Sequence, residues 1–108
     1  TAARAISTLD AAERIGQRVT VAGVRQTSHR SKTAKGEPML FLTIEDMSGM
    51  LDVVFFPNAY RQAKEIVSSA RPFLITGMVE MDISKGEPLL RAERAVGVGA
   101  YRYHFALP

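Results

Sequence analysis

Five stretches of the chain alternate apolar and polar residues, which is the pattern of β-strands that bury one face. They span residues 18–24, 39–46, 50–56, 72–83 and 89–96. In the second stretch Leu40, Leu42 and Ile44 share one face, while Phe41 and Thr43 share the other. In the fourth stretch the inward face is predicted to consist of Phe73, Ile75, Gly77, Val79, Met81 and Ile83. The pattern therefore predicts a protein built mainly of strands.

Two further segments place apolar residues at helical spacing. Residues 6–16 predict a short helix that Ser7 or Thr8 caps and Gly16 ends. Its apolar face is predicted to consist of Leu9, Ala12 and Ile15. Residues 57–70 predict a second helix, because Pro57 suits a first helical turn. Its buried face is predicted to consist of Tyr60, Ala63, Ile66 and Val67.

The four residues Lys-Gly-Glu-Pro occur twice, at residues 35–38 and 85–88. Their flanks do not match, so we interpret them as two turns and not as an internal duplication. Each copy comes directly before a strand, where a proline misses no ladder hydrogen bond. The first copy ends residues 25–38, which show no periodicity and predict a long, basic, polar loop.

Three strands, a helix and two more strands is the element order of the OB-fold, a five-stranded Greek-key barrel whose ligands lie on strands two and three. Gly23 and Gly77 support it, since a glycine inside a strand often marks a barrel corner. We therefore predict an all-β protein with a helix between strands three and four and a short N-terminal helix. The expected organisation is a linker and helix over residues 1–17, the barrel over 18–96 and a tail or linker over 97–108.

Composition narrows the possible classes of protein. The chain has 108 residues, which suits one domain, and a net charge of +3, which mildly favours polyanionic partners. It contains no cysteine, so disulfides and cysteine-ligated zinc are excluded. It has no apolar run long enough for a membrane span and no signal peptide, so we expect a cytoplasmic protein without membrane contact. Because the chain begins at Thr1, we expect it to be part of a longer protein.

Residues 16–60 closely resemble the OB domain near the C-terminal end of bacterial DNA polymerase III alpha subunits, the C-family polymerases. The matching features are Val-Ala-Gly at 21–23, a basic loop ending in Lys-Gly, Met-x-Phe-Leu-Thr-Ile-Glu-Asp at 39–46 and Leu-Asp-Val-Val-Phe-Phe-Pro at 51–57. Phe-Leu-Ile-Thr-Gly-Met-Val-Glu at 73–80 is similar to the fourth strand of that family. The family includes replicative and error-prone members, and these residues fit both.

The resemblance implies a parent chain that is a nucleotidyltransferase extending DNA. In that family the metal-binding carboxylates lie in another domain, and the OB domain is the part that meets single-stranded template. We therefore expect a single-stranded DNA-binding module that acts in replication, without catalytic residues, metal or cofactor of its own. Glu45, Asp46 and Asp52 are near one another in sequence, but their turn and strand positions argue against a metal site.

The candidate nucleic-acid contacts come from the residue types and from the fold. The candidates are Arg25, His29, Arg30, Lys32, Lys35, Phe41, Thr43, Phe56, Lys85 and Arg91. Cations before the second strand can pair with phosphates, and His29 is expected to strengthen this pairing in mildly acidic solution. Phe41 and Phe56 can stack on bases, and Thr43 can donate a hydrogen bond. Lys85 and Arg91 are expected to close the binding surface from the other side.

Two other functions fit the same fold. The barrel can be a protein-docking module within the polymerase assembly, because OB barrels also bind proteins and the same loops can face other domains or a partner subunit. Tyr101, Tyr103 and Phe105 add support, since they alternate like a strand that could pair with a sheet edge. A looser version of residues 39–60 also occurs in the anticodon-binding OB domains of class II aminoacyl-tRNA synthetases. We expect the fragment itself to be monomeric, with single-stranded DNA and other parts of the polymerase holoenzyme as its partners.

Overall fold

The computed structural model describes residues 5–98. Tyr101, Tyr103 and Phe105, on which the docking alternative depended, lie outside the described residues. The elements in chain order are β1 (Ala5–Ile6), α1 (Thr8–Ala12), β2 (Arg18–Lys32), β3 (Pro38–Asp46), β4 (Gly49–Phe55), α2 (Pro57–Val67), β5 (Phe73–Asp82) and β6 (Glu87–Gly97). In the described part of the chain no helix is long and apolar enough to cross a membrane.

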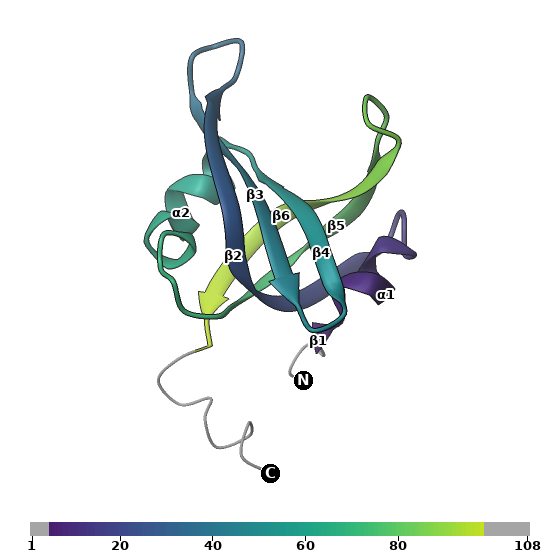
Figure 1. The fold of residues 1–108 in the computed structure, drawn as a ribbon. Helices are drawn as coiled ribbons and strands as arrows, with labels where there is room; N and C mark the ends of the chain where they lie inside the picture. The colour runs from purple at the N-terminus through teal and green to yellow at the C-terminus, as the bar shows by residue number, and fades with distance from the viewer. Residues whose placement is uncertain (1–4, 99–108) are drawn as a thin grey trace.

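Five strands close into a barrel (Figure 1). The sheet order is β1-β2-β3-β4-β6-β5, and the antiparallel pairing of β2 with β5 closes the five strands from β2 onward into a ring, with β1 outside it. The β4–β6 pair is parallel, and the other barrel pairs are antiparallel. The predicted OB-fold is therefore confirmed. The two-residue strand β1, which runs parallel to β2, was not predicted because it is too short to show alternation.

The barrel interior is filled by the side chains that strand alternation placed inward. In β3 Leu40, Leu42 and Ile44 are buried, whereas Phe41 on the other face is 39% exposed. The largest fully buried side chains are Phe55, Phe73, Ile44, Ile75 and Leu90. The opposite face is open only in part, because Thr20 on β2 and Val54 on β4 are buried there, whereas Phe41 on β3 stays exposed.

Two glycines let the strands approach closely. A Cβ atom on Gly77 would lie 2.3 Å from the carbonyl oxygen of Arg91, and one on Gly23 would lie 2.9 Å from that of Glu45. The β5–β6 register also shifts between Thr76 and Gly77. Both positions therefore need a residue without a side chain, as predicted for barrel corners.

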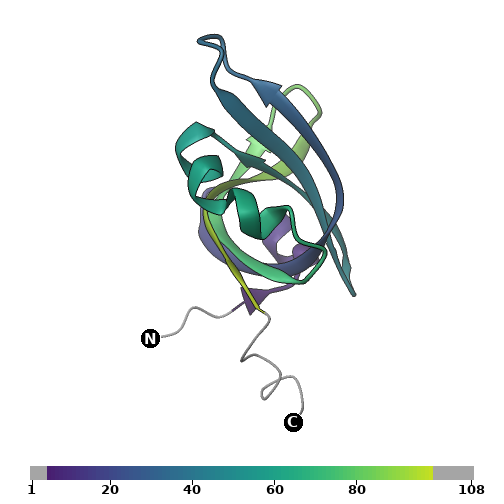
Figure 2. The same cartoon turned by 90° about the vertical axis from the view of Figure 1, so that its left-hand side faces the viewer.

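Helix α2 begins at Pro57 as predicted and packs against β6, β3 and β4 (Figure 2). It buries Tyr60, Ala63 and Val67, and Ile66 packs partly buried against the core. The helix ends at Val67, a few residues before the predicted end.

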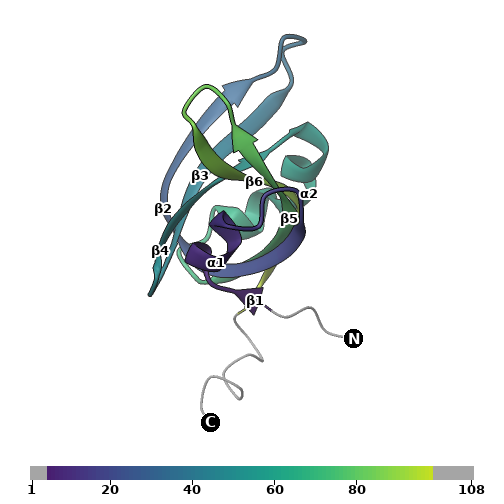
Figure 3. The same ribbon diagram turned by 90° about the vertical axis from the view of Figure 1, so that its right-hand side faces the viewer.

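The predicted apolar face of the first helix is wrong at Leu9 and Ile15, whereas Ala12 packs partly buried against the core as predicted. In α1, which packs against β4 and β2 (Figure 3), the buried residues are Thr8 and Ala11, whereas Leu9 is 60% and Ile15 is 44% exposed. Ser7 caps the helix, as predicted, by accepting a hydrogen bond from the Asp10 backbone N–H. Hydrogen bonds, and not apolar spacing, set the rotation of this one-turn helix.

Those hydrogen bonds converge on Asp46 in the turn between β3 and β4. The backbone N–H and the hydroxyl of Thr8 each donate to the Asp46 carboxylate at 2.8 Å. The backbone N–H groups of Ser48 and Gly49 donate to the same carboxylate at 2.9 and 3.1 Å. Partial burial would raise the pKa of Asp46, but the hydrogen bonds from Thr8 and Ser48 outweigh it and lower the pKa to about 2.

The predicted long loop over residues 25–38 is also wrong, because β2 continues to Lys32 and pairs with β3 as far as Pro38. Only residues 33–37 form a turn, in which the Thr33 N–H donates to the Glu37 carbonyl and Gly36 has a positive φ of 83°. The paired segment of residues 27–43, the β2–β3 arm, extends beyond the barrel (Figure 1). No side chain between residues 30 and 38 is buried, so this part of the arm shows no alternation.

The β5–β6 hairpin extends in the same way. Met81 and Ile83 were predicted to face inward, but they are 46% and 89% exposed. They lie past the last buried β5 residue, Val79, where the hairpin has left the barrel. The β2–β3 arm and this β5–β6 tip (residues 81–88) project from the same end of the barrel, opposite β1 (Figure 1).

Candidate nucleic-acid interface

A groove of about 460 Å³ lies between the β2–β3 arm and the β5–β6 tip. The groove is lined by Thr27, Ser28, His29, Phe41, Leu42, Thr43, Asp52, Val53, Asp82, Ser84, Lys85 and Leu89. Its residues come from five strands and the β5–β6 turn, so only the closed barrel assembles it. It occupies the position where OB-folds take their ligands, on strands two and three of the barrel between two loops.

Cross-strand pairing explains the floor of the groove. Thr27 pairs with Thr43, Thr43 with Asp52, and Asp52 with Leu89, so this row of side chains runs across four strands. Paired positions share one face of a sheet. Because Leu42 and Val53 on the adjacent positions are buried in the core, the row faces outward.

The next row contributes two aromatic rings. His29 pairs with Phe41, and their rings stack with centroids 6.4 Å apart and an angle of 29° between the planes. Phe41 is 39% exposed despite being a large apolar side chain. Such a stacked and exposed pair provides a flat surface on which an unpaired base can stack.

Asp52 lies in the middle of the groove and is held from two sides. The Thr43 hydroxyl donates a hydrogen bond of 3.0 Å to Asp52 Oδ1. The Lys85 ammonium lies 3.7 Å from Asp52 Oδ2, which makes an ion pair that joins the β5–β6 tip to β4. The carboxylate side chain is 34% exposed, so it stays accessible from the groove.

The turn that carries Lys85 is shaped by Asp82. The Asp82 carboxylate accepts hydrogen bonds from the Ser84 hydroxyl at 2.7 Å and from the Ser84 N–H at 3.1 Å. The Ser84 hydroxyl is the main cause that lowers the pKa of Asp82. The Asp82 carbonyl accepts from the backbone N–H groups of Lys85 and Gly86, which closes the turn. Lys85 is therefore placed by a well-bonded turn and not by a free loop.

Four of the ten predicted contact residues meet in the groove: His29, Phe41, Thr43 and Lys85. The cations of the β2–β3 segment lie elsewhere. The Arg25 guanidinium donates to the Val67 carbonyl at 3.0 Å, at the C-terminal end of α2. Arg30 pairs with Leu40, whose side chain is buried in the core, so Arg30 lies on the inward face of the arm and not on the groove face.

Lys32 pairs with Pro38 at the end of the arm, and Lys35 lies in the turn at its tip. Both residues are exposed, and neither lines the groove. Phe56 precedes α2 as its N-cap residue and is 44% exposed, again outside the groove lining. The structure therefore separates an aromatic and polar groove from cations on the arm beside it.

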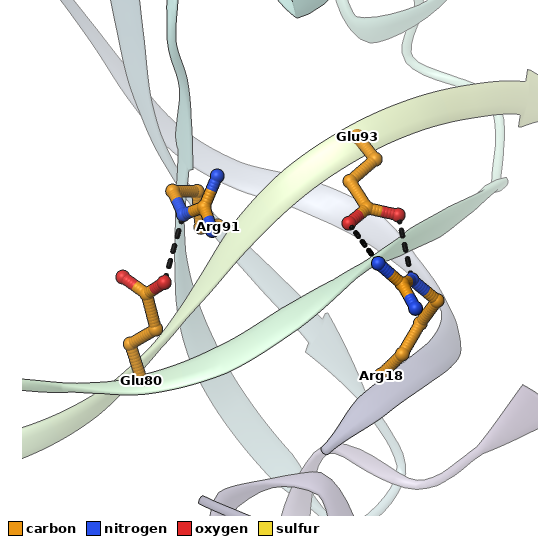
Figure 4. A network of polar contacts seen from close by, with 4 residues as sticks. All are labelled: Arg18, Glu80, Arg91 and Glu93. Carbon is orange, nitrogen blue, oxygen red and sulfur yellow. Dashed lines mark hydrogen bonds and ion pairs between the residues drawn. The ribbon is translucent and has the colours of Figure 1, made fainter. Parts of the chain in front are cut away.

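Arg91 is bound to another side chain on the outer face of the barrel. Its Nε donates to Glu80 Oε2 at 2.8 Å, across the β5–β6 pair (Figure 4). Nearby, Arg18 on β2 makes two hydrogen bonds of 2.9 Å to Glu93 on β6 (Figure 4). The Arg18 guanidinium lowers the pKa of the Glu93 carboxyl. These exposed ion pairs link β2 to β6 and β5 to β6 on the outer surface of the barrel.

A second hollow lies beside these ion pairs. It is lined by Ile6, Arg14, Arg18, Val19, Thr20, Thr76, Glu93 and Arg94. It shares no residue with the groove. Its arginines therefore provide a natural comparison for the cations of the arm.

Sequence reasoning missed Asp52, Asp82 and Ser84 as groove residues. Asp52 was considered only as a metal ligand, and among residues 5–98 no group of three potential ligands meets. The signal for Asp52 was present, because strand phase places it on the outer face opposite Thr43. Nothing local in the sequence indicates that Lys85 lies near it.

The barrel is similar to regions of bacterial DNA polymerases. An error-prone DNA polymerase of Ruegeria pomeroyi is 38% identical over 65 residues, which is 60% of this chain and 6% of that protein. A DNA polymerase III subunit alpha of Pseudomonas aeruginosa is 30% identical over 79 residues, which is 73% of this chain and 7% of that protein. The chain thus spans only a small part of the length of these relatives.

Among solved structures, asparaginyl-tRNA synthetase from Pyrococcus horikoshii has the same fold over 90% of this chain and 23% of its own length, with a TM-score of 0.68 and 20% identity. The family of OB-fold nucleic acid binding domains matches residues 15–96. This match covers the whole barrel except the last residue of β6. The chain therefore belongs to the family of OB-fold nucleic acid binding domains, and its barrel is related to that of DNA polymerase III alpha subunits and error-prone DNA polymerases.

Proposed function

We propose that this chain is a single-stranded DNA-binding module of a C-family DNA polymerase, and that it meets the template strand during replication. The observation that carries the proposal is the exposed His29–Phe41 stack on the outer face of β2 and β3, inside a groove of a barrel whose relatives are DNA polymerases. Residues 18–96 are the binding domain, and the segments on either side connect it to the rest of the parent chain.

Base stacking provides the sequence-tolerant part of binding. A base laid on Phe41 buries the exposed part of that ring, and every base can do so because every base has a flat π-face. Thr43 borders the same surface. A template reader needs this tolerance, since it must bind whatever sequence is being copied.

Cations beside the groove supply the electrostatic part. On the arm, Arg30, Lys32 and Lys35 contact phosphates where the DNA strand leaves the groove. Lys85 faces the DNA from the β5–β6 tip. Arg25 adds positive charge while keeping its bond to the Val67 carbonyl, whereas the charge of Arg91 is balanced by Glu80. With a net charge of only +3, we expect weak binding by the isolated module.

The parent chain is, in this proposal, a DNA-directed DNA polymerase whose active site lies in another domain. This module positions the template and has no catalytic group of its own. Other domains or subunits of the polymerase are its protein neighbours.

The test is a titration of isotopically labelled protein with a short oligothymidine at low salt, followed through the backbone amide NMR signals. We expect the signals of His29, Phe41, Thr43 and Lys85 to move together, and those of residues around the second hollow to stay in place. An unchanged spectrum at millimolar DNA would contradict the proposal and favour the protein-docking function.

An anticodon stem-loop RNA tests the alternative that this chain is an anticodon-binding domain. We expect the protein to bind single-stranded DNA at least as tightly as an RNA loop of matching sequence. A strong preference for the RNA loop would favour an anticodon-binding domain.

A further inference from the structure

Asp52 places a carboxylate in the groove, in an ion pair with Lys85. Its carboxylate lies among the lining residues and is 34% exposed, while Thr43 and Lys85 contact it from either side. A phosphate next to this carboxylate would be repelled, because like charges in a partly buried site interact strongly. Asp52 therefore favours a hydrogen-bond donor of the ligand over a phosphate.

The carboxylate has room for further donors. An ionised carboxylate offers about four lone-pair positions, and the Thr43 hydroxyl occupies one of them on Oδ1. Lys85 lies 3.7 Å from Oδ2, which is an ion-pair distance longer than a hydrogen bond. Both the Asp52 oxygens and the Lys85 ammonium can thus bond a ligand without losing their mutual attraction.

The position of Asp52 relative to Phe41 suits a base. Phe41 pairs with Val54, and Thr43 pairs with Asp52, so Asp52 lies diagonally across the β3–β4 pair from Phe41. Diagonal neighbours on one sheet face are about 7–8 Å apart. The edge of a base stacked on Phe41 would reach the carboxylate.

We propose that the groove selects guanine from a single strand, with the base stacked on Phe41, its N1–H and N2 amine donating to Asp52 and its O6 accepting from Lys85. Guanine presents two neighbouring donors beside an acceptor, which matches a carboxylate beside an ammonium. Cytosine and adenine each offer one amine next to acceptors, and thymine places an acceptor on both sides of its single N–H. This inference rests on the proposed function: every base still binds by stacking on Phe41, and the polar contacts add a modest preference for guanine in the same groove.

The test uses an oligothymidine of about eleven nucleotides, within the site size of one OB barrel, with one central position varied. The probes carry thymine, cytosine, adenine, guanine or hypoxanthine at that position, and fluorescence anisotropy at constant low salt gives each Kd. We expect guanine to bind about tenfold more tightly than thymine, as one bidentate contact provides. Hypoxanthine lacks the N2 amine, so it should lose most of this gain.

The matched variants are Asp52→Ala and Glu65→Ala, which remove the same charge from the groove and from the exposed face of α2. In Asp52→Ala the guanine probe should lose its advantage over the hypoxanthine and adenine probes, and the all-thymine probe should bind as well as before or more tightly, because a negative charge has left the groove. Glu65→Ala should keep the guanine preference. If Asp52→Ala does not fold, Asp52→Asn keeps the shape of the side chain and replaces one acceptor by a donor, and it should also lose the preference.

The outcomes separate the two proposals. Equal binding of all probes by the unaltered protein, or a guanine preference that survives Asp52→Ala or Asp52→Asn, overturns the guanine inference and leaves the proposed function standing. Failure of the unaltered protein to bind any probe overturns both.

Discussion

At the scale of single residues, strand phase decides which side chains meet a ligand. Phe41 lies between the buried residues Leu40 and Leu42, so alternation predicts that it faces outward, and the structure confirms this with a 39% exposed ring. Its contact with His29 could not be predicted, because the segment before β3 was expected to be a loop. An exposed aromatic side chain on this face has no role in the core and is available for stacking.

Phe41→Ala should weaken binding of an oligothymidine by about 1–3 kcal/mol, or roughly 5- to 150-fold in Kd, because the base loses its stacking partner. Phe56→Ala is the comparison, since Phe56 is similarly exposed but does not line the groove. We expect it to change Kd less than about twofold. Anisotropy measures both values, and equal losses in the two variants would contradict the groove as the binding surface.

Asp46 makes the free energy of unfolding depend on pH. Its pKa is lowered from 3.8 to about 2 in the folded state, so the carboxylate stabilises the fold fully above pH 3.8 and loses this effect as the pH falls through 2. We expect the loss to be on the order of 1–2 kcal/mol, reduced by partial solvent exposure.

Asp46→Asn should lower the free energy of unfolding at neutral pH and remove this part of the acid dependence. Urea unfolding between neutral pH and pH 2 measures it, with Glu45→Gln as the neighbouring exposed control. An unchanged acid profile in Asp46→Asn would show that the Thr8 and Ser48 hydrogen bonds do not stabilise the fold.

At the scale of elements, close approach of backbones limits what a strand can carry. The alternation in β5 predicted Gly77 at an inward position, and its role as a corner is confirmed by the register shift beside it. A glycine there is needed because Arg91 and Ala92 of β6 occupy the space where a Cβ would lie.

Gly77→Ala should lower the free energy of unfolding by about 2–3 kcal/mol, because the new methyl group meets backbone atoms that cannot turn aside. Gly97→Ala is the matched control at the end of β6, since among the described residues other than Gly97 and its two chain neighbours no atom lies within 4 Å of the place that its Cβ would take. That variant should stay within about 0.5 kcal/mol. Denaturant unfolding of the three proteins distinguishes the two sites, and a Gly77→Ala protein as stable as the control would contradict the close approach.

At the scale of the whole molecule, charge is divided between two regions. The arm beside the groove carries Arg30, Lys32 and Lys35, whereas Arg14 and Arg94 border the second hollow. Electrostatic attraction by net charge alone would not distinguish these regions, but phosphate contact would.

The double variant Arg30→Ala with Lys32→Ala should reduce the slope of log K against log salt by about 1.4, since each lost phosphate contact on a single strand contributes about 0.7. Arg14→Ala with Arg94→Ala removes the same charge from the other region and should leave the slope nearly unchanged. Anisotropy titrations at several salt concentrations measure both slopes. Equal changes would mean that the arm attracts DNA only through net charge.

The sequence by itself determined the order of the barrel strands, the inward faces of β3 and β4, the start of α2 at Pro57 and the family. These features are local, because alternation reports burial on each strand separately and Pro57 marks a helix start without help from distant residues. It also identified four residues that meet in the groove: His29, Phe41, Thr43 and Lys85.

Only the tertiary structure decided the length of β2, the rotation of α1 and the surroundings of Asp52. The outer half of β2 is held by backbone pairing with β3. Because its side chains are exposed, the sequence shows no hydrophobic alternation that would predict this pairing. Thr8 faces inward because Asp46, far along the chain, binds it. Asp52 meets Lys85 only because the barrel closes and brings the β5–β6 tip to β4, a contact between segments that no local pattern encodes.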